Sequence, residues 1–164
     1  MKGGKKMNIL EVNNLYKTFG SEDTKVEALK NVSFSISKGE FVAVVGESGS
    51  GKSTLLNAIG ALDTPTLGKV FIDGKDIFSM KEEQLTIFRR RNIGFIFQAY
   101  NLIPELSVEQ NIIFPLLLDY KKPNKANVEE ILEALSLKDR RNYLPRQLSG
   151  GQQQRVAIGT ARTM

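Results

Sequence analysis

Apolar and polar residues alternate in the N-terminal part of this 164-residue chain. Val32, Phe34 and Ile36 are each followed by a serine, a period of two that is typical of a strand with one buried and one solvated face. Another apolar segment precedes them at residues 9–12. Together the two segments predict an antiparallel sheet near the N-terminus.

Three further segments predict strands. Residues 41–45 form a continuous apolar run rich in β-branched side chains, which is typical of a strand covered on both faces, so we expect it to be the central strand. Residues 69–73 predict a strand that ends at Gly74, and residues 93–97 predict another short buried strand.

Helical spacing begins after a glycine-rich turn. Leucine and isoleucine recur every three or four positions between residues 55 and 62, which predicts a helix. Pro65 and Gly68 end this helix and its connection. A further helix is expected around residues 81–89.

From Gln98 onward the pattern becomes helical. Ser107 and Gln110 have the spacing of a capping box, and the helix they begin should stop or kink near Pro115, which lacks an N–H group. Apolar residues then recur at helical spacing over residues 124–136, which predicts an amphipathic helix.

These elements predict one domain over residues 1–164. Its parts are an α/β core over 7–98, an inserted helical subdomain over 99–147, and a C-terminal segment over 148–164. Residues 1–6 are basic and lead into a strand pattern rather than an apolar core, so we expect no signal peptide and interpret Met7 as the natural start.

Composition narrows the function classes. The chain has no cysteine and no histidine, which excludes a disulfide framework and removes a common general base. The absence of cysteine also favours a cytoplasmic location for the protein. The longest apolar stretches are far shorter than the roughly 20 residues that a membrane-spanning helix requires. The net charge of +5 fits a polyanionic ligand or an anionic membrane surface, but basic runs usually form solvated faces and we expect no nucleic-acid partner.

Residues 46–53 match the pattern G-x-x-x-x-G-K-[ST], between a predicted strand and a predicted helix. Its glycines can adopt positive φ, so that successive N–H groups surround a phosphate at the start of the helix. Lys52 is expected at the β- and γ-phosphates of ATP, and Ser53 at Mg²⁺. The residues of this phosphate loop expected to contact the nucleotide are Gly46, Glu47, Ser48, Gly49, Ser50, Gly51, Lys52, Ser53 and Thr54.

A second glycine segment occupies residues 148–152. Ser149, Gly150 and Gly151 begin a predicted helix, where N–H groups and the helix dipole again face an anion. Because one domain rarely needs two such sites for one triphosphate, we expect the second to serve a nucleotide held by another subunit.

With these two motifs the whole chain resembles the ABC transporter ATPase family. The resemblance implies an α/β fold: a P-loop NTPase core with an N-terminal antiparallel β subdomain, an inserted helical subdomain, and the C-terminal part of the core missing. It also implies a head-to-tail homodimer and a transmembrane permease partner, which places the chain on the inner face of the cell membrane.

The resemblance also assigns residues outside the phosphate loop. Phe19 looks like the aromatic residue that stacks on adenine. Gln98 looks like the glutamine that reaches Mg²⁺ and the attacking water, which makes it, with Lys52, a candidate catalytic residue. Segment 148–152, including Gln152, looks like the family's signature, in which Ser149 and Gly151 would contact the γ-phosphate across the dimer. Arg155 is interpreted as structural, pairing locally.

Finer features lie in residues 60–63, 88–91 and 100–104. They resemble the branch that serves lipoprotein release, macrolide efflux and bacitracin-type peptide-antibiotic export. This branch implies a peptide, antibiotic or lipid-linked substrate.

The residues after Gln152 include no acid. The family's metal-binding aspartate, its catalytic glutamate and its γ-phosphate histidine are therefore not in this chain, and we expect it to bind Mg-ATP but to hydrolyse it poorly. Residues 160–164 depart from the branch's sequence, which is compatible with a frameshift, a fusion or a truncation.

Other functions share part of this pattern. DNA-repair ATPases have both glycine motifs, but a very long coiled coil separates them, and the segment between Gln98 and Leu148 has no extended heptads. A small-molecule kinase would need no second glycine segment. A non-catalytic nucleotide-binding fragment stays open as an alternative.

Overall fold

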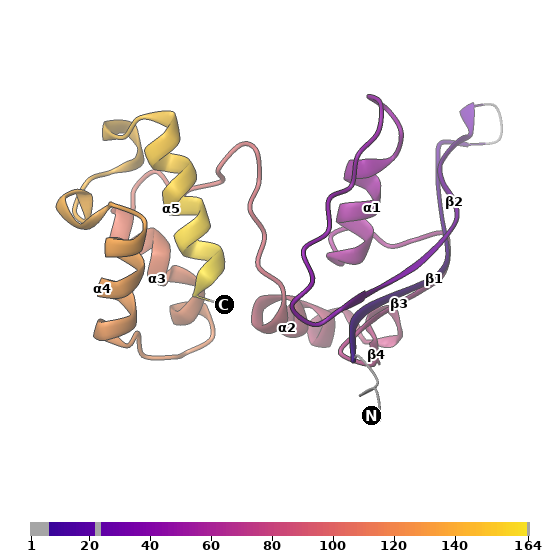
Figure 1. The fold of residues 1–164 in the computed structure, drawn as a ribbon, viewed down its shortest axis with the longest axis horizontal. Coiled ribbons are helices and arrows are strands. Elements are labelled where there is room, and N and C mark those ends of the chain that lie inside the picture. Colours follow the sequence, from indigo (N-terminus) through magenta and orange to yellow (C-terminus); the bar gives the residue numbers. More distant parts are fainter. Residues whose placement is uncertain (1–6, 22–23, 164) are drawn as a thin grey trace, which may run out of the picture. The chain divides into compact units, whose positions relative to one another are not determined.

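The computed structural model describes residues 7–21 and 24–163. It forms two compact units, residues 1–86 and 87–164 (Figure 1). The interpretation of residues 1–6 as an extension lies outside the described residues. The domain boundaries expected from the sequence stay a prediction.

The first unit is built on a sheet with the strand order β2-β1-β3-β4. Strands β1 (Asn8–Phe19) and β2 (Val26–Ser37) pair antiparallel, as do β1 and β3 (Leu67–Ile72). Strand β4 (Lys75–Asp76) comes after a tight turn. The predicted N-terminal antiparallel sheet is confirmed, and so is the strand near residues 69–73.

One face of this sheet carries the core of the first unit. Val12, Leu15, Leu29 and Val70 are buried, and so is Ile77 of the short helix η2 (Ile77–Ser79). Helix α1 (Lys52–Ile59) comes after the phosphate loop, and helix α2 (Glu82–Asn92) spans the boundary between the two units. Both predicted helices are confirmed, although α1 ends before Leu62.

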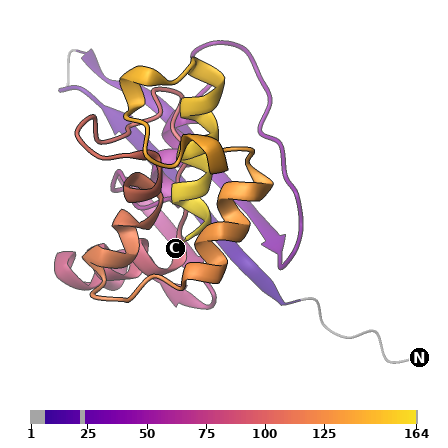
Figure 2. The same cartoon turned by 90° about the vertical axis from the view of Figure 1, so that its left-hand side faces the viewer.

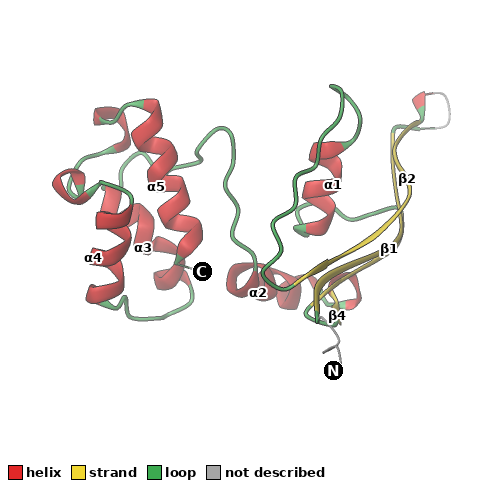
Figure 3. Cartoon of the chain, viewed as in Figure 1, coloured by secondary structure: helices red, strands yellow, loops and turns green. Residues whose placement is uncertain are grey.

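The predicted strands at 41–45 and 93–97 are wrong. Both segments are extended but unpaired (Figure 3). Phe41 is 95% exposed and Val45 is 85% exposed. Their side chains suit a buried strand, but a strand forms only where a neighbour supplies hydrogen bonds, and the sheet of the described residues supplies none to either segment.

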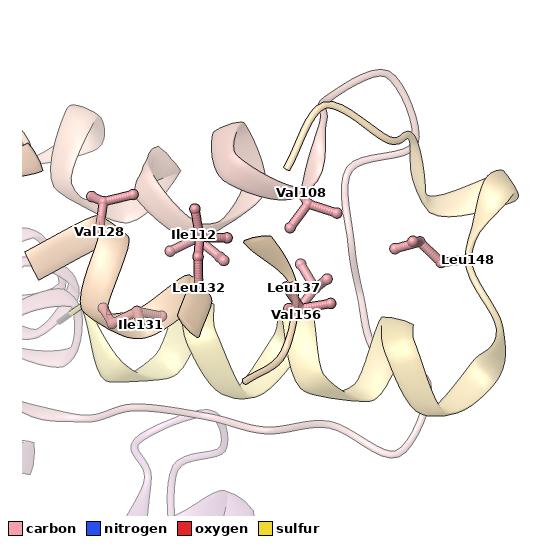
Figure 4. Close-up of a cluster of buried hydrophobic side chains, with 8 residues drawn as sticks. All are labelled: Val108, Ile112, Val128, Ile131, Leu132, Leu137, Leu148 and Val156. Atoms are coloured by element: carbon pink, nitrogen blue, oxygen red, sulfur yellow. The ribbon is translucent and has the colours of Figure 1, made fainter. Parts of the chain in front are cut away.

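The second unit contains α3 (Val108–Leu118), α4 (Lys125–Ala134) and α5 (Gly150–Arg162), with short helices η3 (Lys138–Arg140) and η4 (Pro145–Gln147). Figure 2 shows the three long helices side by side. Their apolar faces meet in a single buried cluster (Figure 4). Its members are Val108, Ile112, Val128, Ile131, Leu132, Leu137, Leu148 and Val156.

Helix α3 begins at the predicted capping box. The Ser107 hydroxyl accepts from the Gln110 backbone, and the Gln110 side chain accepts from the Ser107 backbone. Pro115 does not stop this helix, which continues to Leu118. A proline removes the donor that the carbonyl four residues earlier would otherwise receive. Here the Thr160 hydroxyl of α5 donates to that carbonyl, of Asn111, at 3.3 Å.

A buried carboxylate ties the end of α3 to α2. Asp119 caps α3 and its side chain is only 3% exposed. It accepts from Arg90 at 3.0 Å, from Arg91 at 2.9 Å and from Lys121 at 2.9 Å. The hydrogen bond from Lys121, joined by that from Arg91, lowers the pKa of Asp119 to about 2 against the opposing effect of burial. The carboxylate is therefore ionised at neutral pH and joins three basic side chains.

The residue after Asp119 stores backbone strain. Tyr120 has a φ of 56° and is 97% exposed. A left-handed conformation is costly for a side chain with a Cβ atom and is free for glycine. We predict that Tyr120→Gly raises the free energy of unfolding by about 0.5–1 kcal/mol, measured by urea denaturation. Tyr120→Ala keeps the Cβ and should give no such gain; an equal gain from both variants would trace the strain to the ring instead.

Candidate nucleotide-binding site

Helix α1 begins without a side-chain cap. Its N-cap is Gly51, and no side chain accepts from its first turn. The first N–H groups of a helix have no partner within the helix. The start of α1 therefore presents donors to an anion, with the positive end of the helix dipole behind them.

The glycines of the phosphate loop adopt the expected backbone. Gly46, Gly49 and Gly51 have φ values of 154°, 79° and 85°. Gly51 also approaches strand β2 closely, since a Cβ atom there would lie 2.4 Å from the Ala28 carbonyl oxygen. Only glycine permits both this conformation and this contact.

Lys52 folds back over the loop. Its ammonium donates to the carbonyls of Gly46, at 2.9 Å, and Glu47, and to the Ser50 hydroxyl at 3.2 Å. A turn within the loop, from Ser50 N–H to the Glu47 carbonyl, supports the same shape. The ammonium is held beside the helix N-terminus, where a phosphate could accept from both.

Ser53 is exposed in the first turn of α1. Mg²⁺ keeps several waters and usually takes one or two protein ligands besides substrate phosphates. The described residues contain no group of three His, Cys, Asp or Glu side chains suited to a metal. A lone hydroxyl beside the phosphate donors fits a metal brought by a nucleotide.

Phe19 lies at the end of β1, paired with Val26 of β2. It is 44% exposed. Strand β2 continues from Val26 to Ala28, whose carbonyl contacts Gly51. The first unit thus brings the candidate adenine-stacking ring and the phosphate loop to neighbouring positions on β2.

The signature segment begins α5 with a capping box. The Ser149 hydroxyl accepts from Gln152 N–H at 3.3 Å, and the Gln152 side chain accepts from Ser149 N–H at 2.8 Å. Gly150 lies under the Tyr100 hydroxyl, 3.1 Å from where a Cβ atom would be. No atom would lie within 4 Å of a Cβ at Gly151, so this glycine faces open space.

Gln98 is exposed in a turn of the second unit. Tyr100 and Asn101, shortly after it, have left-handed φ values of 60° and 50°. The Gln98 turn and the signature lie in the second unit, where the Tyr100 hydroxyl lies close to Gly150. The phosphate loop and Phe19 belong to the first unit. The site residues predicted from the sequence therefore form two groups.

Sequence reasoning missed Asn111, which is buried in α3. Its side chain accepts from Ile103 N–H at 2.8 Å and donates to the carbonyls of Ile103 and Leu106. These bonds hold the segment after Gln98 against α3. The available signal was an amide within an otherwise apolar helix.

Arg155 differs from its interpretation. Its Nε atom is buried and has no hydrogen-bond partner among the residues that the structure describes. The expected local pairing is wrong for this atom.

Gly49 and Gly51, two of the three positive-φ glycines of the loop, allow a matched test. An alanine at Gly49 meets only the cost of left-handed backbone, since a Cβ there has nothing within 4 Å. An alanine at Gly51 would in addition displace β2. We predict that Gly51→Ala lowers the free energy of unfolding by at least about 1 kcal/mol more than Gly49→Ala, measured by urea denaturation. Equal losses would mean that β2 does not constrain the loop.

The chain is similar to known proteins in sequence and in fold. Residues 29–163 match the family model described as ABC transporter. An uncharacterised ABC transporter ATP-binding protein of Thermotoga maritima is 46% identical over 93% of this chain and 66% of its own length. The macrolide export ATP-binding/permease protein MacB of Mannheimia succiniciproducens is 46% identical over 94% of the chain and 24% of its own length. The lipoprotein-releasing system ATP-binding protein LolD of Aquifex aeolicus is 50% identical over 82% of the chain and 61% of its own length.

Solved structures of the bacterial ABC transporter cassette MJ0796 are similar as well. Its dimeric structure has a TM-score of 0.82 at 44% identity, and a dimeric post-hydrolysis state bound to ADP and Pi has 0.84. Each match covers 93% of this chain and 68% of the solved chain. The chain thus spans about two thirds of the length of these cassettes and about a quarter of MacB. It belongs to the ABC transporter family, as an ATP-binding cassette related to MacB and LolD.

Proposed function

We propose that this chain binds Mg-ATP through the phosphate loop, as the nucleotide-binding part of an exporter ATPase. The observation that carries the proposal is the uncapped start of α1 with the Lys52 ammonium held beside it. Ser53 would ligate Mg²⁺ and Thr54 would add a phosphate contact. Phe19 would stack on the adenine. When bound, Mg²⁺ would neutralise charge on the phosphates.

The Lys52 ammonium tests this proposal directly. We predict that Lys52→Ala weakens Mg-ATP binding at least about tenfold, because a charge-assisted hydrogen bond to phosphate is lost. The measurement is a titration with a fluorescent ATP analogue. Lys38→Ala, at an exposed turn, is the matched control and should bind like the original chain. Unchanged affinity in Lys52→Ala would refute the proposal.

The signature is proposed to act on the nucleotide of a second copy. Gly150 and Gly151 leave backbone N–H groups at the start of a 13-residue helix, and Gly151 faces open space. In a head-to-tail homodimer Ser149 and Gly151 would contact the partner's γ-phosphate, with Gln98 reaching Mg²⁺ and the attacking water. The dimeric MJ0796 structures support the formation of a dimer by similarity.

A charged side chain introduced at Gly151 should block dimer formation without disturbing the folding of the chain. A glutamate in the first turn interacts favourably with the helix dipole, and its Cβ would have no other atom within 4 Å, but its charge would repel a phosphate. We predict that Gly151→Glu abolishes Mg-ATP-dependent association in sedimentation velocity while nucleotide binding persists. Gly151→Gln has the same bulk without the charge and should associate more strongly than Gly151→Glu. Equal association of the two variants would contradict the role of the signature.

The whole protein is proposed to couple ATP binding and hydrolysis to export through a permease. MacB joins an ATP-binding part and a permease in one chain, and LolD is named for lipoprotein release. A peptide, antibiotic or lipid-linked substrate is the class that these relatives support. Within the described part of the chain, no helix has the length and apolarity to span a membrane. We propose a peripheral position on the cytoplasmic face of the membrane.

A further inference from the structure

Lys17 is a cation placed beside the candidate adenine platform. It lies two residues before Phe19 on β1, beside a register irregularity in the pairing of β1 with β2. The Lys17 ammonium lies 4.9 Å from the centre of the Phe19 ring, within the range of a cation–π interaction. The Lys17 side chain is only 13% exposed, whereas Phe19 is 44% exposed.

Two strong acceptors fix the position of this ammonium. It donates to the Asp63 carboxylate at 2.6 Å and to the Thr64 carbonyl at 2.7 Å. Lysine side chains are flexible when solvated, but here both acceptors and partial burial restrict the ammonium to one place. The ring is therefore held against a fixed cation.

Asp63 follows the end of α1 and is hydrogen-bonded to it. Its N–H group and that of Leu62 both donate to the Asn57 carbonyl, in the last turns of that helix. The connection after Asp63 is attached to β1, since Thr66 N–H donates to Tyr16 and Thr18 N–H donates to the Thr66 hydroxyl. Lys17 thus links the strand that ends in Phe19 to the helix that begins at Lys52.

From these contacts we infer that Lys17 is a positioning residue for the adenine base. The inference rests on the proposed function, since it concerns the same nucleotide site. Lys17 holds the Phe19 ring at a set distance from the phosphate loop. Because the faces of an aromatic ring carry negative charge, an ammonium on one face also reduces the repulsion between the other face and a stacked base.

If Lys17 positions the base, its loss should affect ligands that carry a base and not ligands that consist of phosphates alone. Inorganic tripolyphosphate binds the phosphate loop but has no base to stack. A loss of the Lys17 ammonium should therefore weaken ATP binding and leave tripolyphosphate binding unchanged. The ratio of the two affinities is insensitive to a general loss of stability, because both ligands bind the same folded state.

We predict that Lys17→Met weakens Mg-ATP binding about three- to tenfold, the range of a partly desolvated cation–π contact, without weakening Mg-tripolyphosphate binding. Isothermal titration of both ligands against the full chain gives the two affinities. Lys17→Arg keeps a cation that can pair with Asp63 and stack on the ring, and it should restore the original ratio.

A double-mutant cycle with Phe19→Ala tests the route of the effect. If Lys17 acts through the ring, Lys17→Met should cause no further loss of ATP affinity in the Phe19→Ala background. Equal weakening of both ligands by Lys17→Met, or no weakening of ATP, would overturn the inference while Lys52-dependent ATP binding stood. Binding of neither ligand through Lys52 would refute the proposed function and the inference with it.

Discussion

The backbone N–H groups at the start of a helix have no hydrogen-bond partner within that helix. The phosphate loop at α1 and the signature at α5 differ in how they treat these groups. At α5 the capping box of Ser149 and Gln152 satisfies the N–H groups of these two residues and holds the segment in shape, and the N–H groups of the two glycines between them stay open. At α1 the N-cap is a glycine and no side chain caps the helix. A lysine ammonium lies over the loop instead. The start of α1 therefore leaves its N–H groups free to surround an anion. The start of α5 is held in one conformation by its capping box and keeps the glycine N–H groups exposed.

In the second unit, contacts between segments distant in sequence hold the start of α5 in place. Asn111 holds the segment after Gln98 against α3. Thr160 of α5 and its C-cap residue Thr163 donate to the carbonyls of Asn111 and Ile112 in the same helix α3. The proline that removes a donor from α3 is thus compensated by the signature helix. These hydrogen bonds and the shared apolar cluster join α3, α5 and the segment that follows the Gln98 turn.

The sequence predicted the features that depend on local patterns. The capping box at Ser107, the amphipathic helix near 124–136 and the positive φ of the loop glycines arise from residues within a few positions of one another. Segments 41–45 and 93–97 failed because strand formation depends on a neighbour, and side-chain pattern carries no information about one. The hydrogen bond between Lys17 and Asp63 could not be predicted either, and neither could the hydrogen bonds of the Asn111 side chain. The sequence pattern does not show that the segments they join are close in the fold. Phe19 and Gln98 came from resemblance alone.

The phosphate loop keeps its shape although the segment before it is unpaired and exposed. Three sets of contacts hold its conformation: the turn between Glu47 and Ser50, the bonds of the Lys52 ammonium, and the contact of Gly51 with β2. None of these involves residues 41–45. The donors that would meet a phosphate are therefore fixed by α1 and the antiparallel sheet, the same two elements that Lys17 joins through Asp63. The phosphate loop and the Phe19 ring, which we propose to stack on adenine, are therefore both held by these two elements of the first unit.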